Sequence, residues 1–209
     1  PFKNIKDFYG KPLVYWNLVA LQNSTKIDKI FVATDCKEIK EVVNSFNFSK
    51  VAVYDRDPKN ANDTASTESV MLEFINQNFF QDNDLFILVQ ATSPLTQTRD
   101  FDMALKTLAS KKADSILSCV RQKRFFWSND ATPLNYELNN RPRRQDFDGI
   151  LMENGAFYIN SVVNIRNDKN RLSGKIAIYE MAEYTAIEID EEGDWLIAEQ
   201  LMKKNNKCK

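Results

Sequence analysis

The chain has 209 residues, a length that fits one α/β domain or a domain with an insertion, and its 43% hydrophobic and 27% charged residues are an ordinary globular composition. The formal net charge of −1 argues against nucleic acid and anionic membranes as partners, and no apolar run reaches the roughly 18 residues that span a bilayer. There is no histidine, which excludes Ser-His and Cys-His triads and His-ligated metals; the three distant cysteines argue against a disulfide framework and favour a reducing, cytoplasmic compartment.

The first 120 residues alternate between helical and strand-like hydrophobic patterns. The predicted elements are a helix at 11–22, a strand at 30–34, a helix at 37–46, a strand at 51–54, a polar loop at 55–67, a helix at 68–79, a strand at 85–89, a helix at 99–111 and a strand at 114–120. Ser66 or Thr67 is expected to cap the third of these helices. Strands and helices that alternate at this spacing predict an α/β fold with a mainly parallel sheet.

Polar side chains follow three of the predicted strands. The stretch LFILVQATSPL (85–95) turns polar at Gln90, Thr92 and Ser93, and Asp35 and Arg56 follow the two earlier strands. Ligands of open α/β sheets bind outside the carboxyl ends of the strands, so this edge is the predicted ligand cleft. The alternative is that QATSP is only a capped loop that begins the next helix.

The regular pattern stops between residues 121 and 155, where the sequence is aromatic and basic. We interpret this segment as an excursion within a single domain over 1–209. Regular patterns return as strands at 155–160, 175–181 and 185–190, followed by a helix at 192–204.

A group of acidic side chains lies in AIEIDEEGDW (186–195). On a strand, Glu188 and Asp190 would point to the same face, with Asp194 just beyond them. Such carboxylates suit a hard cation such as Mg²⁺, or else they stabilise the N-terminus of the following helix.

Two basic segments are candidates for anion binding. Arg141, Arg143 and Arg144 in RPRRQ could form paired hydrogen bonds to a carboxylate or phosphate, or they could belong to a solvated loop. A single basic patch in a nearly neutral chain is weak support for nucleic-acid binding. Lys3 and Asn4 precede the first predicted helix and could approach phosphates.

Together these segments resemble the sugar-acid cytidylyltransferase family, and within it the CMP-sialic acid synthetases (N-acylneuraminate cytidylyltransferases). The matching stretches, in the order of the family and across nearly the whole chain, are PFKNIKDFYGKPL, FVATD, DRDPKNANDTAST, LVQATSPL, RPRRQDFDGILMENGAFYI and EIDEEGDWLIAEQ. The resemblance implies a three-layer, Rossmann-like nucleotidyltransferase fold. It also implies transfer of CMP from CTP to a sialic acid with Mg²⁺, by a homodimer in which the excursion at 121–155 completes the partner's active site.

The resemblance assigns the nucleotide side of the site to the N-terminal half of the chain. Lys3 and Asn4 match positions near the CTP phosphates and ribose, and Arg56 matches a nucleotide-contacting arginine. Ser66 and Thr67 fall in the family's cluster of small hydroxyls beside the cytosine.

The sugar-acid side is assigned to the excursion and the strand ends. Arg143 and Arg144 match the arginine block implicated in catalysis, and Gln90 matches a substrate-contacting glutamine with a catalytic role. Gln145 and Asn154 are the remaining expected contacts to the sugar acid.

Two departures from the family pattern concern phosphate and metal binding. Asp190 matches a metal-binding aspartate, but position 188 holds glutamate where aspartate is usual. The family's first strand and phosphate-binding loop would precede Pro1, and we expect that the given sequence omits them.

Three alternative functions stay open: an enzyme for another nonulosonic or octulosonic acid, a non-catalytic nucleotide-binding relative, and a nucleic-acid binder.

Overall fold

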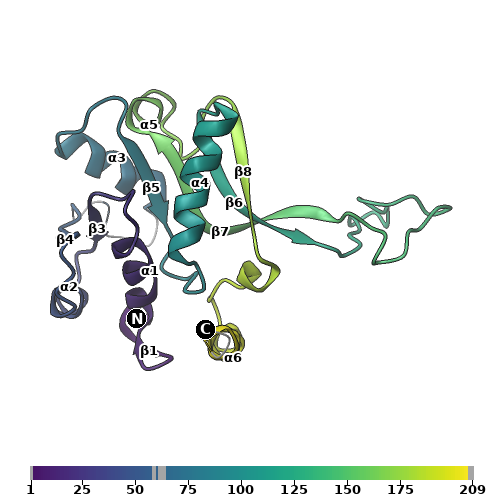
Figure 1. The fold of residues 1–209 in the computed structure, drawn as a ribbon, viewed down its shortest axis with the longest axis horizontal. Coiled ribbons are helices and arrows are strands. Elements are labelled where there is room, and N and C mark those ends of the chain that lie inside the picture. Colours follow the sequence, from purple (N-terminus) through teal and green to yellow (C-terminus); the bar gives the residue numbers. More distant parts are fainter. Residues whose placement is uncertain (1, 58–59, 61–64, 207–209) are drawn as a thin grey trace.

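The computed structural model describes residues 2–57, 60 and 65–206. Its elements in chain order are η1 (Lys3–Ile5), β1 (Asp7–Phe8), β2 (Lys11–Pro12), α1 (Leu13–Gln22), β3 (Ile30–Ala33), α2 (Lys37–Ser45), β4 (Val51–Tyr54), α3 (Thr67–Gln77), β5 (Leu85–Val89), α4 (Thr98–Lys111), β6 (Ser115–Gln122), β7 (Ile150–Ser161), α5 (Val162–Asp168), β8 (Ile176–Met181), η3 (Glu183–Ala186) and α6 (Glu192–Asn206) (Figure 1). The helices and strands predicted up to residue 120 are present, each within a few residues of its expected ends. Parts of the predicted polar loop, at 58–59 and 61–64, and Cys208 lie outside the described residues.

The main sheet has four strands in the order β5-β7-β6-β8, and β3 and β4 form a separate parallel pair. β6 is parallel to β8, whereas β7 is antiparallel to both β5 and β6. Strands β5, β6 and β8 therefore share one direction, as predicted, and β7 is the exception. It runs in the opposite direction because the chain returns from the excursion after β6 without a helix that crosses the sheet.

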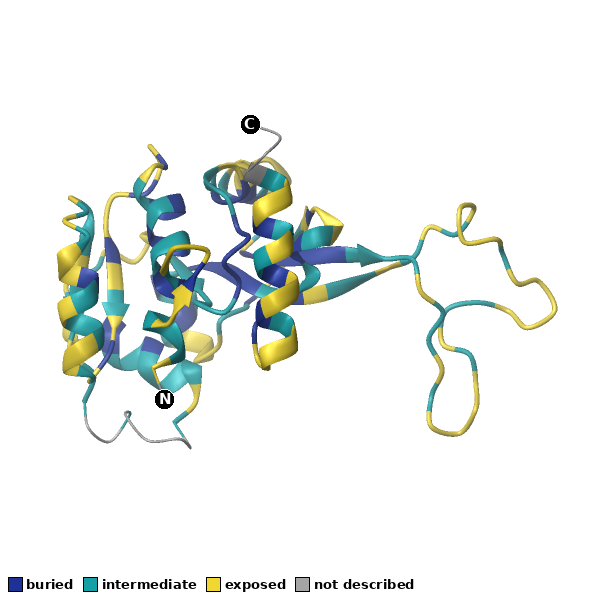
Figure 2. Cartoon of the chain, turned by 90° about the horizontal axis from the view of Figure 1, so that it is seen from below, coloured by how far each residue is buried: buried dark blue, intermediate teal, exposed yellow. Residues whose placement is uncertain are grey.

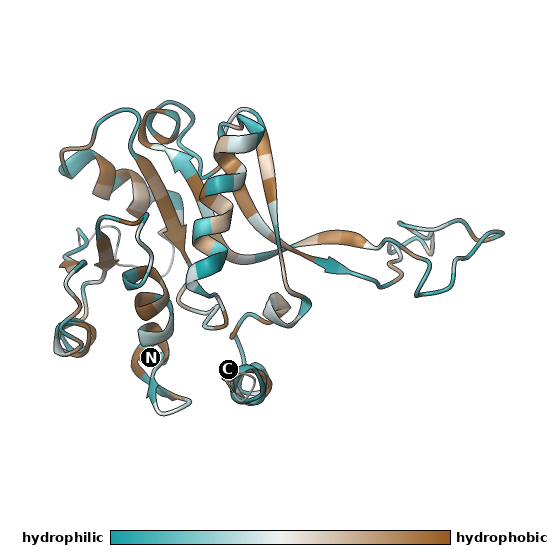
Figure 3. Cartoon of the chain, viewed as in Figure 1, coloured by the Kyte–Doolittle hydropathy of each residue, from teal (hydrophilic) through white to brown (hydrophobic). Residues whose placement is uncertain are grey.

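Helices cover both faces of the sheet, which confirms the predicted three-layer α/β fold (Figure 1). Successive side chains of a strand point to opposite faces. On β5, Ile87 packs in the core that contains Phe101 of α4, and its neighbour Phe86 packs with Phe74 of α3 and Ile165 of α5. Figure 3 shows that the strands of the main sheet are mostly hydrophobic, as burial between two helical layers requires.

The segment from 185 to 190 is not the strand that its alternating pattern predicts. It consists of the end of η3 and an extended chain, fixed by one backbone hydrogen bond from Ile189 N–H to the carbonyl of Thr92 at 2.9 Å. The side chain of Ile189 is fully buried beside Trp195 of α6. The alternation therefore reflects one-sided packing on a helix, without a neighbouring strand.

The two ends of the described chain pack together. Phe8, in the short hairpin of β1 and β2, contacts the ring of Trp195 edge-on, with ring centroids 5.5 Å apart. The backbone N–H of Tyr9 donates to Glu199 of α6 at 3.0 Å. The N-terminal segment is thus held next to the acidic segment that precedes α6.

The excursion leaves the body of the molecule as a two-stranded ribbon. β6 and β7 pair as far as Arg121 with Leu151 and Gln122 with Ile150, so β7 begins earlier than the predicted strand at 155–160. Beyond the ribbon, residues 123–149 form mostly irregular loops that project far from the body and are largely exposed (Figures 1 and 2).

α5 is a short helix that the sequence pattern did not predict. It begins directly after β7 and is capped by Ser161, whose hydroxyl accepts the N–H of Asn164 at 3.3 Å. No helix within the described ranges combines the length and the apolar character needed to cross a bilayer.

Candidate active site

Asp35 and Arg56 meet at the ends of the parallel strands β3 and β4. Their side chains form a close ion pair, and the Arg56 guanidinium, as hydrogen-bond donor, lowers the pKa of the Asp35 carboxyl below its usual value. Arg56 Nε is buried without a hydrogen-bond partner among the described residues. The ion pair therefore fixes Arg56 at this edge of the sheet, and its contact with the nucleotide stays a prediction.

Ser66 is the N-cap of α3. Its hydroxyl accepts the N–H of Ser69 at 3.1 Å, which confirms one of the two predicted caps. Thr67 is the first residue of the helix and is half-buried. The predicted contact of both hydroxyls with cytosine stays a prediction; Ser66 already has a structural role without it.

A large irregular bulge at residues 154–157 of β7 lies beside the end of β5. Leu117 of β6 pairs with Tyr158, and Cys119 pairs with Glu153, so Ser118 alone stands opposite residues 154–157. The Ser118 hydroxyl fills part of this gap by accepting the N–H of Phe157 at 3.1 Å. The bulge lets the backbone of β7 reach the polar segment that follows β5.

Gln90 is fixed to this bulge through its backbone. Its N–H donates to the carbonyl of Ala156 at 3.1 Å, and its own carbonyl accepts a hydrogen bond from Asn17 of α1 at 3.0 Å. Asn154, also in the bulge, is only 3% exposed and donates to the carbonyl of Thr185 at 3.2 Å. Its Oδ1 has no partner within the described part of the chain, so the predicted substrate contact of Asn154 rests on that atom.

Glu188 and Asp190 do not have the strand geometry that the sequence predicted. Glu188 accepts the hydroxyl of Thr92 at 3.0 Å, and its carboxylate lies over Gly155 in the bulge. Asp190 is exposed and faces Lys3 of η1, whose Nζ lies 3.5 Å from Asp190 Oδ1 and donates to the Ile189 carbonyl at 2.7 Å. The predicted strand is not formed because this segment has no neighbouring strand; the chain is extended here, with the buried Ile189 between the two carboxylates.

Asp194 takes the helix-capping role that was the alternative for the acidic group. It accepts the N–H of Glu191 at 2.9 Å and that of Asp190 at 3.1 Å, and these hydrogen bonds lower the pKa of its carboxyl. Capping of α6 therefore accounts for Asp194, but it does not account for Glu188 or Asp190.

The donor set of this segment suits a partly protein-bound Mg²⁺. Within the described residues, no group of three or more His, Cys, Asp or Glu side chains is arranged to hold a metal. Mg²⁺ is commonly held by one or two carboxylates together with substrate phosphates, and two hard oxygen donors, Glu188 and Asp190, are present here. These residues fit an ion that binds together with a phosphorylated substrate.

We expect Gly155→Ala to damage the site through Glu188. At φ +65° a side chain is strained, and the added Cβ would lie 3.1 Å from Glu188 Oε2, so we expect an activity loss of about tenfold besides a stability loss of about 1 kcal/mol. Gly10→Ala is the matched control, because Gly10 has φ +79° and a Cβ added there would meet no heavy atom within 4 Å. Thermal unfolding and initial rates separate the effects; equal activities of the two variants would contradict the prediction.

Asn4 lies beside Lys3 in η1 and is half-buried. The structure thus brings Lys3 and Asn4 next to the Asp190 segment, and Gln90 and Asn154 next to Glu188 through the bulge.

The structure does not bring the arginine block to this edge within one chain. Arg143, Arg144 and Gln145 are exposed on a turn of the excursion, which projects away from α6 and η1 (Figures 1 and 2). Arg141 differs from them, because its guanidinium stacks on Phe125 at 4.6 Å from the ring centroid and is thereby fixed to the loop.

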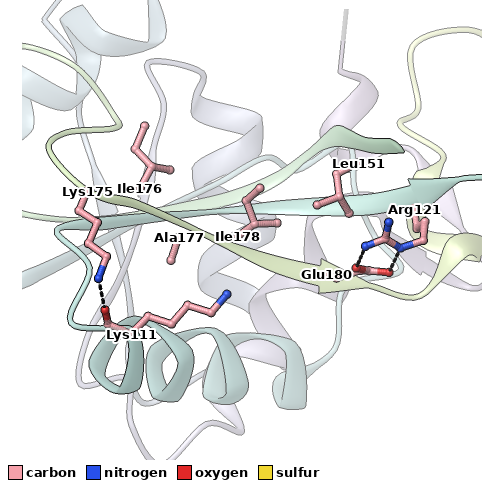
Figure 4. A pocket seen from close by; sticks show the side chains of 8 residues that line it. All are labelled: Lys111, Arg121, Leu151, Lys175, Ile176, Ala177, Ile178 and Glu180. Carbon is pink, nitrogen blue, oxygen red and sulfur yellow. Dashed lines mark hydrogen bonds and ion pairs between the residues drawn. The ribbon is translucent and has the colours of Figure 1, made fainter. Parts of the chain in front are cut away.

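A surface pocket at β8 does not coincide with these residues. This open pocket of about 450 Å³ wraps around the outer edge of β8, with Ile178 and Leu151 on its apolar side (Figure 4). An ion pair between Arg121 and Glu180, with atoms 2.6 Å apart, closes one end of it. None of the predicted site residues lines this pocket.

Two positioning residues were not predicted from the sequence, Asn17 and Gly155, whereas Thr92 belongs to the polar cluster that was expected at the ligand cleft. Asn17 carried a usable signal, since it is a lone amide in the apolar helix LVYWNLVALQ. Gly155 acts through its contact with Glu188, which is distant in sequence, and no local pattern indicates that contact.

Comparison with known proteins gives a consistent family assignment. A family model described as cytidylyltransferase matches residues 1–202. The chain is 36% identical over 207 residues to an N-acylneuraminate cytidylyltransferase of Oncorhynchus mykiss, and 34% identical over 207 residues to N-acylneuraminate cytidylyltransferase B of Danio rerio. Each alignment covers 96% of this chain but only 46% and 47% of the relative, so the chain spans about half the length of these proteins.

A solved structure shows the same fold at low sequence identity. It is that of CMP:2-keto-3-deoxy-manno-octonic acid synthetase complexed with CTP, with a TM-score of 0.70 and 16% identity. The superposition covers 97% of this chain and 92% of that one.

Proposed function

The chain belongs to the cytidylyltransferase family, and from this premise we propose that it transfers CMP from CTP to the anomeric hydroxyl of a sialic acid and releases pyrophosphate. Relatives named for N-acylneuraminate as substrate match nearly the whole chain. The observation that carries the proposal is the convergence of three distant segments at one edge: the end of β5, the bulge of β7 and the segment 187–190.

In the proposed reaction the nucleotide lies along the ends of β3, β4 and α3. Arg56 supplies a fixed cation, and Ser66 and Thr67, at the N-terminus of α3, would lie beside the cytosine. Lys3 and Asn4 would contact the phosphates and ribose. Glu188 and Asp190 would hold Mg²⁺, which neutralises phosphate charge when bound.

The chemical step needs no covalent enzyme intermediate. The anomeric oxygen forms a bond to the α-phosphorus of CTP, the bond from that phosphorus to the pyrophosphate oxygen breaks, and the attacking hydroxyl loses its proton. Catalysis of this kind rests on positioning and charge neutralisation, and it is compatible with a chain that has no histidine. Gln90 would orient the sugar acid, together with Gln145 and Asn154.

The arginine block would act from a second copy of the chain. Arg143 and Arg144 are exposed on a projecting excursion, distant from the acidic segment of their own chain (Figure 1). We therefore retain a homodimer in which the insertion at 121–155 of one copy completes the site of the other, with 1–209 acting as one catalytic domain. Free thiols at Cys36 and Cys119 support a cytoplasmic location.

Pyrophosphate release tests the proposal directly. The intact gene product is incubated with CTP, Mg²⁺ and a panel of eight- and nine-carbon sugar acids. We expect release with an N-acylated nine-carbon acid. Release only with another acid would replace the substrate, and a folded protein that binds CTP but reacts with no acid would be a non-catalytic relative.

A further inference from the structure

Four side chains form a continuous path of contacts from α3 to β7. Arg171 donates from Nε to Glu68 Oε1 at 2.6 Å, and its guanidinium stacks on the ring of Tyr158 at 4.9 Å from the centroid. The Tyr158 hydroxyl in turn donates to Glu153 in a very short hydrogen bond. None of these four residues was singled out by the sequence or used in the reaction described above.

The two ends of this path lie at the two halves of the proposed site. Glu68 is in the first turn of α3, two residues after the N-cap Ser66 on the nucleotide side. Glu153 directly precedes Asn154 in the bulge that contacts Gln90 and Glu188 on the sugar-acid side. Arg171 itself comes from the loop between α5 and β8, so its guanidinium adds a polar link between the first turn of α3 and β7.

Three of the four side chains in the path are buried or half-buried, whereas Glu153 is exposed. Tyr158 is 4% exposed, and the side chains of Arg171 and Glu68 are 23% and 26% exposed. Burial and the Glu153 hydrogen bond raise the pKa of Tyr158 to about 12, so its hydroxyl remains a donor at neutral pH. A planar guanidinium can donate to a carboxylate and stack on a ring at the same time, which an ammonium group does less well.

We propose that Arg171 is a positioning residue that couples the nucleotide end of the site, through Glu68, to the sugar-acid end, through Tyr158 and Glu153. This inference rests on the proposed function. Arg171 touches neither substrate in this arrangement; it fixes the N-terminus of α3 relative to the bulge of β7. A change at the nucleotide end is therefore expected to alter sugar-acid binding.

The chain offers a matched control in Arg166. This arginine also joins α5 to α3, since it donates to Asp82 at 3.3 Å and to the carbonyl of Ile75 at 3.4 Å. Those contacts are at the opposite end of α3 from Ser66. Arg166→Met thus removes a link between α5 and the C-terminal part of α3 without touching the path.

The experiment measures KM for CTP, KM for the sugar acid, and thermal unfolding in Arg171→Met, Glu68→Gln, the double variant and Arg166→Met. We expect each single variant of the path to raise both KM values by about tenfold, and the double variant to add little more. Arg166→Met should leave both KM values within about twofold. A Glu68→Gln variant that changes KM for CTP alone, or an Arg166→Met variant that matches Arg171→Met, would overturn the coupling.

Calorimetry with CTP keeps this test separate from the test of function. If the unmodified protein binds CTP but releases no pyrophosphate, the proposed function fails. The path is then tested by CTP affinity, which should fall about tenfold in Arg171→Met and stay unchanged in Arg166→Met. If Arg171→Met does not fold, Arg171→Lys keeps the charge and is expected to show a smaller loss in the same direction.

Discussion

Asp190→Asn is expected to lower kcat by at least about a hundredfold and to raise the Mg²⁺ concentration needed for half-maximal activity. Asparagine keeps the shape of the side chain and removes the charge that would hold the cation. The Asp190 side chain is 71% exposed, and its contact with Lys3 is a weak surface pair at 3.5 Å. The free energy of unfolding should therefore change by less than about 0.5 kcal/mol.

Asp194→Asn provides the control within the same segment. Its carboxylate accepts two backbone N–H groups at the start of α6, so its replacement should lower stability by up to about 1 kcal/mol and leave most of the turnover. Magnesium titrations of the initial rate, with thermal unfolding alongside, compare the two variants. If Asp190→Asn retained turnover within about threefold of the unmodified protein, Asp190 would have no part in cation binding.

The fold could be predicted where the local hydrophobic pattern matched the packing. Helix α3 illustrates this, because its cap at Ser66 and its apolar stripe of Met71, Phe74 and Ile75 can all be predicted from the local sequence pattern. The segment at 187–190 illustrates the failure. Its alternation arises from packing of Ile189 against α6, and only the three-dimensional arrangement distinguishes this from pairing with a strand.

The sequence indicated which residues belong to the candidate site better than it indicated how those residues are arranged in space. Lys3 and Asp190 were each singled out by type and position, yet their contact depends on the two ends of the chain packing together. The bulge of β7 is still harder to predict from the sequence, because its register is set by Ser118 and by the left-handed backbone of Gly155. Such long-range pairing has no signature in a single local window.

Arg143→Ala is expected to lower kcat/KM by about a thousandfold, whereas Arg124→Ala should change it by less than about threefold. Both arginines are exposed in the excursion, so neither replacement should affect folding, and the difference isolates contact with substrate. Initial rates at saturating and limiting sugar acid, with thermal unfolding as the folding check, measure it. Equal activities of the two variants would remove Arg143 from the site.

Mixing two inactive variants tests whether Arg143 acts on its own chain or on a partner. In a shared site, Arg143→Ala and Asp190→Asn damage the same site from opposite chains. A mixed dimer then has one site with both lesions and one site with neither.

Random exchange of subunits in an equal mixture should restore about a quarter of the unmodified activity, since half of the dimers are mixed and each has one intact site of two. If both residues acted within one chain, every site would contain one lesion and the mixture would stay inactive. The projection of the excursion away from the acidic segment favours recovery (Figure 2).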